Sequence, residues 1–260
     1  MVRIGAHVEQ QDPVGAALAV DGEAAQFFLG DPQGWKTPTV AFAGGPEALR
    51  DAAKSAGVAL YVHAPYVINV ASANNRIRIP SRKLLQQTID LAAEIDAAAV
   101  VVHGGHVTAN DDPRVGFDNW RKAAERLEQR CPVLIENTAG GNHAMARTIE
   151  ALGRLWDAVG DTGIGFCLDT CHAFAGGHRL PEAVDAIRAV TGSIDLVHAN
   201  DSQGAFDSGR DRHTRLGTGE IDQDALVATI AAAGAPAVCE TPDSTIAEDI
   251  AWLRERLSAG

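Results

Sequence analysis

Six apolar runs in this chain each end on a side chain that can bind a metal ion. They are Leu60–His63, Val100–His103, Val133–Glu136, Gly165–Asp169, Ile194–His198 and Ala237–Glu240. Short apolar runs of this kind are typical of parallel strands that are buried on both faces. If they are strands of one barrel, their carboxyl ends lie on one rim, where residues distant in sequence meet. The pattern therefore constrains both the fold and the chemistry.

Segments with helical periodicity separate these runs. We expect strands near residues 2–7, 25–29, 58–63, 98–103, 132–136, 164–169, 194–198 and 236–240. We expect helices near residues 14–20, 46–56, 84–95 (after a Pro80-Ser81 entry), 117–130, 144–159, 181–190, 222–233 and 244–257. Eight strands, each followed by a helix, predict the α/β class and a (β/α)₈ TIM barrel with its active site at the C-terminal rim. The length of 260 residues suits one barrel, so we expect residues 1–260 to form a single domain.

Composition narrows the setting of the protein. The chain has no run of about 18 uninterrupted apolar residues, and residues 1–7 lack the apolar region of a signal peptide. Its four cysteines are too few and too irregular for a disulfide framework. We therefore expect buried, reduced thiols in a monomeric, intracellular (cytoplasmic) protein without a membrane partner.

The charge of the chain bears on its substrate. A formal net charge of −12 argues against a simple basic nucleic-acid binder. However, three bound divalent cations would halve that charge and concentrate positive charge in one cleft. The net charge therefore does not exclude a phosphate substrate.

Two segments on the predicted rim are longer than a barrel needs. Residues 69–79 carry Arg76 and Arg78, and residues 201–219 carry Arg210, Arg212 and Arg215. Long irregular loops in compact domains are more often functional than accidental. We expect both segments to contribute to binding.

Spacing indicates how the ligands would divide among ions. Alternate residues of an extended segment face the same side, so Asp211 and His213 can bind one ion together. Asp169 ends a strand and His172 follows after the chain turns, which assigns these two to different ions. Glu136 can bridge two cations because it is a carboxylate. Mixed histidine and carboxylate ligands favour zinc or a neighbouring transition metal over magnesium or calcium.

Other histidines have simpler interpretations. We expect His7, at the end of a strand, to be a hydrogen-bonded structural residue. His106, His143 and His178 lie on predicted loops and are expected at the surface or in supporting positions.

Four segments carry a resemblance to a known family. They are Cys167–Gly176, Leu134–Gly140, His198–Asp201, and Asp211–His213 with Leu216–Gly217. They resemble the signature segments of the endonuclease IV family of apurinic/apyrimidinic (AP) endonucleases, and the similarity extends from residues 4–8 to 239–241. The resemblance implies a trinuclear zinc site in a TIM barrel, with Mn²⁺ possible at one or more positions.

The resemblance also implies which residues hold each zinc. The first zinc would be held by His63, His103 and Glu136; the second by Glu136, Asp169, His198 and Glu240; the third by His172, Asp211 and His213. The implied reaction is hydrolysis of the DNA phosphodiester on the 5′ side of an abasic site by a zinc-bound hydroxide, leaving a 3′-hydroxyl. Glu136, Asp169 and Glu240 would be the catalytic carboxylates of this base-excision-repair enzyme.

The implied partner is damaged double-stranded DNA. In the family, an aromatic and an apolar residue after the first histidine ligand enter the base stack, and Tyr66 and Val67 match those positions. Asn69, Arg76, Arg78, Arg210 and Arg212 are the other residues that we expect to bind DNA. The chain departs from the pattern at Gln33, two residues before Trp35, where many members have an arginine. Phosphate attraction is therefore expected to depend more on the remaining arginines.

Two other functions stay open at this stage. A sugar isomerase or epimerase on a related barrel would need a single metal site, which Glu136, Asp169, His198 and Glu240 could form. That reading leaves five donors unexplained. The other is a non-catalytic protein that binds abasic DNA and keeps the zinc ligands only for structure.

Overall fold

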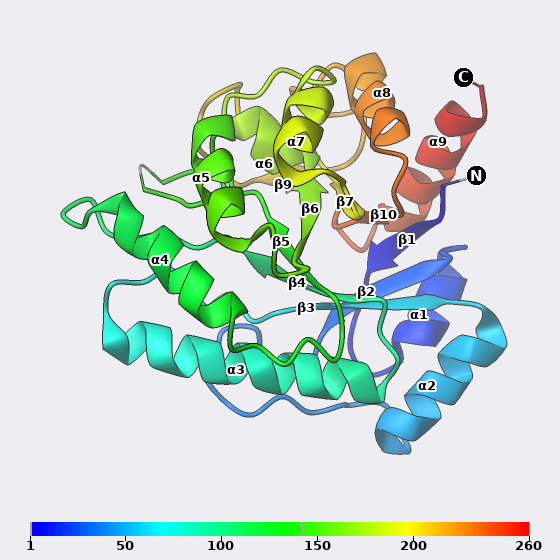
Figure 1. Ribbon diagram of the computed structural model, residues 1–260. Coiled ribbons are helices and arrows are strands. Elements are labelled where there is room, and N and C mark those ends of the chain that lie inside the picture. The colour runs from blue at the N-terminus through cyan, green and yellow to red at the C-terminus, as the bar shows by residue number, and fades with distance from the viewer. Residues whose placement is uncertain (1, 142, 260) are drawn as a thin grey trace.

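Parallel strands close into a barrel in the computed structural model, which describes residues 2–141 and 143–259 (Figure 1). Within these residues the barrel has eight strands: β1 (Ile4–His7), β2 (Ala24–Phe28), β3 (Ala59–His63), β4 (Ala99–His103), β5 (Val133–Glu136), β6 (Gly165–Asp169), β7 (Leu196–Ala199) and β10 (Ala237–Cys239). Each strand pairs with its neighbours in sequence, and β10 pairs with β1 to close the ring. The predicted TIM barrel is confirmed. Its expected extent as one domain stays a prediction, and Met1, Asn142 and Gly260 lie outside the described residues.

Helices surround the barrel (Figure 1). They are α1 (Pro13–Ala19), α2 (Gly45–Ala56), α3 (Asn75–Glu94), α4 (Pro113–Ala124), α5 (Ile149–Val159), α7 (Ala183–Thr191), α8 (Gln223–Ala233) and α9 (Ile246–Ala259), with a short helix α6 (Thr170–Ala175) directly after β6. Large side chains such as Phe27, Trp120 and Phe166 are fully buried in the core, which also includes the inner faces of the helices. Polar side chains cap several helices, as Asp12 does for α1 by accepting the N–H of Gly15.

The inside of the barrel is filled in layers. One apolar cluster consists of Ala24, Tyr61, Ala99, Val101, Leu134, Cys167, Leu196 and Val238. Because side chains alternate along a strand, the residue two positions later also faces inward, nearer the carboxyl end. These residues are Gln26, His63, His103, Glu136, Asp169, His198 and Glu240. The alternation of side chains along the strands therefore places a polar layer next to the apolar one, on the side of the carboxyl ends.

The predicted loop at residues 69–79 is shorter in the structure because α3 begins at Asn75. The Asn74 side chain accepts the N–H of Arg76 at 2.9 Å and so caps the helix earlier than the Pro80-Ser81 sequence indicated. Pro80 lies inside α3. Proline often starts a helix, but here the asparagine cap determines the start.

Other boundaries also differ from the prediction. Helix α4 covers Pro113–Ala124 rather than residues 117–130, because Asp112 caps it by accepting the N–H of Arg114. Helix α5 begins at Ile149 rather than near residue 144, because Ala144 pairs with His106 in an isolated bridge and Thr148 caps the helix. The predicted rim loop at 201–219 contains a short antiparallel pair, β8 (Asp201–Ser202) and β9 (His213–Thr214). This pair fixes part of a segment that was expected to be irregular.

The expectation of buried thiols without disulfide bonds is confirmed. Cys131, Cys167, Cys171 and Cys239 are free and buried. Among the described residues, no helix combines the length and the apolar character that crossing a membrane requires.

Candidate metal centre

The nine predicted ligands meet at the carboxyl ends of the strands. Parallel pairing sets their heights, because His103 lies opposite Glu136 and Asp169 lies opposite His198. The remaining donors come from β3, from α6, from β9 and the residues just before it, and from the residue after β10. The nine donors, which are spread between positions 63 and 240 of the sequence, thus form one polar cluster. This cluster can be divided into three groups.

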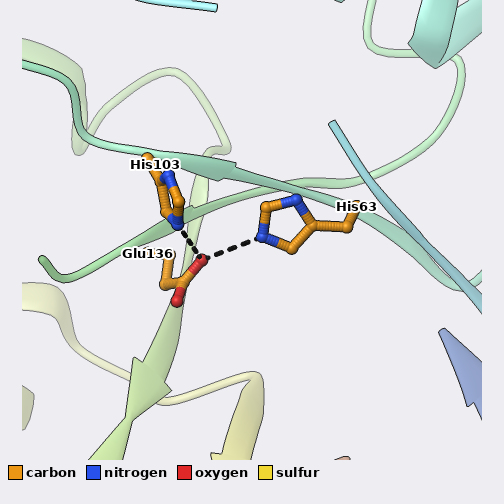
Figure 2. Close-up of side chains that lie close together, drawn as sticks. All are labelled: His63, His103 and Glu136. Atoms are coloured by element: carbon orange, nitrogen blue, oxygen red, sulfur yellow. Dashed lines mark hydrogen bonds and ion pairs between the residues drawn. The ribbon is translucent and has the colours of Figure 1, made fainter. Parts of the chain in front are cut away.

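The first group joins three strands. Oε2 of Glu136 lies 3.2 Å from Nε2 of His63 and 3.2 Å from Nε2 of His103. Figure 2 shows the two imidazoles pointing at this carboxylate. His63 and Glu136 are buried, whereas His103 is half-buried at the edge of the cluster. One carboxylate oxygen and two imidazole nitrogens therefore point at a common space of the size that a cation would occupy.

The second group uses the other oxygen of the same carboxylate. Oε1 of Glu136 lies 3.2 Å from Nδ1 of His198, and donor atoms of Glu136, Asp169 and His198 all lie within 4.8 Å of one another. Oε2 of Glu240 lies 3.4 Å from the same His198 nitrogen. Because its two oxygens face different groups, Glu136 has the position of a bridging ligand.

The third group lies between α6 and the rim segment. Nε2 of His172 is 3.2 Å from Oδ2 of Asp211, and Nε2 of His213 is 3.2 Å from Oδ1 of the same carboxylate. Both imidazole nitrogens are buried, yet neither is aligned to form a hydrogen bond with Asp211 or with any other described residue. Buried polar atoms normally have partners. These free nitrogens therefore fit the requirement of a bound cation.

Hydrogen bonds to the backbone orient two of the imidazoles. Nδ1 of His63 lies 2.8 Å from the carbonyl of Ala64, and Nδ1 of His172 lies 3.0 Å from the carbonyl of Asn137. A carbonyl accepts only from a protonated nitrogen, so Nδ1 carries the proton in both rings. In the neutral ring, Nε2 then presents its lone pair to the cluster, which is the usual arrangement for metal-ligating histidines.

A buried carboxylate shapes the rim segment that carries Asp211 and His213. Oδ1 of Asp201 accepts the N–H groups of Ser202 and Ile221, and Oδ2 accepts that of Gly219. The Asp201 carboxylate thus ties the start of the segment, at Ser202, to its end, at Gly219 and Ile221. Together with the β8–β9 pairing, this holds the third group against α6.

Charges in the cluster compensate one another. Burial alone would raise the pKa of Glu136, but His103 and His198 bring it well below its usual range. Burial would lower the pKa of His172, but Asp169 and Asp211 raise it well above its ordinary value. For His63 burial prevails and its pKa is lowered. In the absence of cations Glu136 is thus charged and His172 retains a proton, which a bound metal would displace.

The predicted DNA-binding pair lies beside the first group. Tyr66 is 53% exposed, and its ring stacks on that of His103 with centroids 5.8 Å apart and planes 19° apart. Partial burial and nearby carboxylates raise the pKa of Tyr66 to about 12, so its hydroxyl is neutral. Val67 is half-buried and packs against the core. Tyr66 is the member of the pair that is open to a ligand.

Two other predicted DNA-binding residues have internal hydrogen bonds. The side-chain amide of Asn69 donates to the carbonyl of His106 and accepts its N–H. The guanidinium of Arg78 donates to the carbonyls of Ser72 and Ala73. These contacts stabilise the segment before α3, and a DNA contact by either side chain stays a prediction.

The remaining predicted DNA-binding residues are exposed. Arg76 lies at the start of α3, while Arg210 and Arg212 line a hollow on the rim together with Asp211. Gln33 is exposed on the loop after β2, where Tyr66 donates its N–H to the carbonyl of Pro32. Exposed positive side chains are thus supplied by two separate segments, the start of α3 and the rim segment that carries Asp211.

The histidines that were set aside lie outside the three groups. His7 is hydrogen-bonded, as expected: its Nδ1 lies 3.1 Å from Nε2 of Gln26. His143 contacts the carbonyl of Thr108, and His178 contacts that of Arg147. His106 is exposed and joins the bridge to Ala144.

The sequence reasoning missed three amide side chains around the ligands. Asn200 donates to Oδ2 of Asp169 at 2.7 Å and to Oε2 of Glu240 at 3.1 Å, and Asn137 bonds the backbone of Asp169 in both directions. Gln26 contacts both His198 and Glu240. The two asparagines follow ligand strands directly, and Gln26 has the same spacing from Ala24 as each ligand has from its apolar neighbour. That spacing was the available signal.

Comparison with known proteins identifies the family of the chain. The xylose isomerase-like TIM barrel family profile matches residues 15–256. Proteins called probable endonuclease 4 from Mycobacterium bovis and Mycobacterium tuberculosis are 58% identical over 253 residues, which cover 97% of this chain and 98% of theirs. The corresponding protein of Mycobacterium leprae is 55% identical over 98% of this chain and 99% of its own.

Solved structures show the same relationship. Endonuclease IV of Thermus thermophilus superposes with a TM-score of 0.85 at 28% identity and covers 99% of this chain and 100% of its own. A D-tagatose 3-epimerase-like protein has a TM-score of 0.78 at 19% identity, covering 99% of this chain and 97% of its own, and shares the fold alone. The predicted resemblance is confirmed, and the chain belongs to the endonuclease IV family of xylose isomerase-like TIM barrels.

Proposed function

We propose that this protein is a metal-dependent endonuclease that hydrolyses the phosphodiester on the 5′ side of an abasic site in DNA and leaves a 3′-hydroxyl. The observation that carries the proposal is the convergence of nine donor residues into three groups, with Glu136 facing two of them. The relatives named endonuclease 4, at up to 58% identity over nearly the whole chain, support the same activity.

The donor sets fit three divalent cations. His63, His103 and Glu136 would hold the first; Glu136, Asp169, His198 and Glu240 the second; His172, Asp211 and His213 the third. Imidazole together with carboxylate favours zinc, and manganese is the alternative at the more carboxylate-rich positions. When bound, such ions supply Lewis-acid stabilisation of a phosphoryl oxygen and lower the pKa of water.

Three carboxylates of the chain are proposed to orient the metal ions. Glu136, Asp169 and Glu240 bring negative charge to the centre and have their oxygens fixed by neighbouring side chains. Their pairing with buried histidines keeps the donors in position before any substrate arrives, and such preorganisation lowers the cost of reaching the transition state. The proposed catalytic role of the three carboxylates is to hold and orient the ions against the scissile phosphate.

The rim would receive DNA from which the damaged nucleotide has been turned out of the stack. Flipping costs least where a base is already missing, and such a nucleotide can reach a recessed cluster. The exposed ring of Tyr66 lies next to the first group, which supports the proposal that it fills the gap left in the helix by the missing base. Val67, Asn69, Arg76, Arg78, Arg210 and Arg212 are the other residues that we propose for the DNA contact.

The sugar isomerase alternative is less well supported. Its four donors do lie together, but His63, His103, His172, Asp211 and His213 join them in the same cluster. A single-metal enzyme has no use for these five side chains. The epimerase-like structural neighbour has 19% identity and so gives no support beyond the fold.

One experiment tests the proposal. Metal content of the purified protein would be measured beside incision of a duplex that contains a single tetrahydrofuran abasic analogue. We expect about three metal ions per chain, one nick on the 5′ side of the analogue, and a 3′ end that a polymerase extends. An intact duplex of the same sequence is the control, and a chelator should abolish the nick.

The same experiment distinguishes the endonuclease from the two other functions. Selective binding of the abasic duplex without incision, under zinc and manganese alike, would support a non-catalytic binding protein. One metal per chain with turnover of a ketose would support the isomerase. Either result would refute the endonuclease.

A further inference from the structure

Gln26 is the one side chain of β2 that faces the metal centre at the height of the ligands. It is fully buried, and it lies two residues after Ala24 of the apolar layer, the spacing shared by His63 on β3 and His198 on β7. Its backbone is also held, because its carbonyl accepts the N–H of Val8 at 2.7 Å. The side chain therefore enters the polar layer from a fixed position.

Every polar atom of this amide has a partner. Oε1 of Gln26 lies 2.8 Å from Nε2 of His198, and Nε2 of Gln26 lies 2.6 Å from Oε1 of Glu240 and 3.1 Å from Nδ1 of His7. The amide thus joins residues of three other strand ends. A fully satisfied buried network of this kind restricts its members to one arrangement.

The contacts determine which way the amide points. Glu240 is a carboxylate and can only accept, so it requires the NH₂ group of Gln26. The amide oxygen then faces His198, whose Nε2 must be the protonated nitrogen in order to donate. A flipped amide would place its oxygen against a Glu240 oxygen that cannot donate, so the Glu240 contact alone fixes the orientation.

The consequence reaches the metal ligands. With Nε2 of His198 engaged by Gln26, Nδ1 is the nitrogen that faces Glu136 at 3.2 Å and Glu240 at 3.4 Å. With Oε1 of Glu240 engaged by the same amide, Oε2 is the oxygen that faces His198. One neutral side chain thus selects the donor atom of two ligands of the second group.

We propose that Gln26 is a positioning residue that orients His198 and Glu240 for the second metal ion. The inference rests on the proposed function for the presence of that ion. The proposed role of Gln26 is tested through the affinity of the protein for that ion, and this affinity is measured without DNA. Partners of metal ligands commonly contribute 10- to 100-fold to metal affinity.

The test compares Gln26→Met, which keeps the approximate size of the side chain but not its hydrogen bonds, with the wild type. Zinc affinity would be measured by competition with a chromophoric chelator, and the ligand field by the visible absorption of the cobalt-substituted protein. We expect the affinity of one of the bound zinc ions to fall about 10- to 100-fold and the cobalt spectrum to change. The matched control is Gln129→Met, which removes the hydrogen bond from the Gln129 amide to the carbonyl of Thr162. Gln129 lies before β5, at the end of the barrel opposite the metal centre.

A second variant keeps the proposal testable if the methionine does not fold. Gln26→Asn retains an amide but is one methylene shorter, so it cannot span His198 and Glu240, and the same loss of affinity is expected. Wild-type zinc affinity and an unchanged cobalt spectrum in a folded variant would overturn the proposal. So would a lower unfolding temperature of the metal-free protein with zinc affinity unchanged, because that result indicates a structural role only.

The outcomes for Gln26 and for the proposed function can be told apart. A wild type that binds zinc but does not incise abasic DNA refutes the activity, while the comparison of affinities still decides the role of Gln26. A wild type that binds no zinc overturns both.

Discussion

Oδ1 of Asp169 accepts the backbone N–H of His172 at 2.6 Å, so one metal-ligand candidate caps the short helix that carries another. Asp169 closes β6 and α6 starts at the next residue, which turns the chain sharply at the rim. The two side chains stay near each other but fall into different groups of donors, Asp169 with Glu136 and His198, and His172 with Asp211 and His213. The cap therefore links the local fold to the distribution of the donors.

Exchange of Asp169 for asparagine separates these two roles. Asparagine is as good a helix cap as aspartate, so Asp169→Asn should retain the cap while Asp169→Ala loses it at a cost of about 1 kcal/mol. Both variants remove the negative charge, and we expect incision to fall by about 100-fold or more with zinc content reduced. Unfolding of the metal-free proteins, zinc content and nicking rate provide the measurements. Full activity of Asp169→Asn would contradict the proposed role, and Asp12→Asn, the same exchange at the cap of α1, is the control.

The sequence was sufficient to predict the barrel and to identify the side chains that gather at its rim. The reason is physical: burial on both faces produces apolar runs, and the period of two then fixes which following residue faces inward. Asp211 and His213 could be paired for the same reason. The start of α3 could not be predicted, because Pro80 and the cap Asn74 gave competing signals and only the folded segment decides between them.

Residues that act through distant partners were harder to find. Gln26 is separated by 172 residues from His198 and by 214 from Glu240, so no local pattern records its contacts. A glutamine in an apolar run is also compatible with a simple edge position. Its role becomes visible only when closure of the barrel brings β2 within reach of β7 and β10 through β1.

Tyr66 provides a test of damage recognition. The stacking of one base on an aromatic ring contributes roughly 1–3 kcal/mol, so Tyr66→Ala should weaken binding to an abasic duplex by about 5- to 150-fold. Tyr66→Phe keeps the ring and should bind nearly as the wild type does. Fluorescence anisotropy with an abasic duplex and with a short intact single strand measures both. Equal losses on the two probes would remove Tyr66 from a role in the duplex gap, and zinc content should be checked because its ring stacks on His103.

The exposed arginines of the rim predict a salt dependence. Each phosphate contact to duplex DNA contributes about 0.9 to the slope of log affinity against log salt. Arg76→Gln and Arg210→Gln should therefore each reduce that slope by about 0.9. Arg154→Gln, which breaks an exposed pair with Glu150 on α5, should leave the slope unchanged. An unchanged slope in either rim variant would exclude that residue from the phosphate contact.

The protons of the cluster predict how pH acts on the protein with and without metal. The pKa of His172 is raised above its ordinary value of 6.5 in the folded protein, so its stabilising contribution is complete below about pH 6.5 and is lost as pH rises through the raised pKa. The pKa of Glu136 is well below its ordinary value of 4.5, so its contribution is present above about pH 4.5 and is lost as pH falls through the lowered pKa. From these two groups, the metal-free protein should be most stable between about pH 4.5 and 6.5.

Zinc should change this profile on the alkaline side. Binding displaces protons from the donors, so zinc affinity should rise with pH by about tenfold per unit for each proton displaced. The difference in unfolding temperature between zinc-loaded and chelator-treated protein should consequently widen from pH 6 to pH 8 at fixed free zinc. His172→Gln should show a smaller widening, whereas His178→Gln, outside the three groups, should behave as the wild type does. A difference that stays constant with pH would contradict the sharing of protons among these donors.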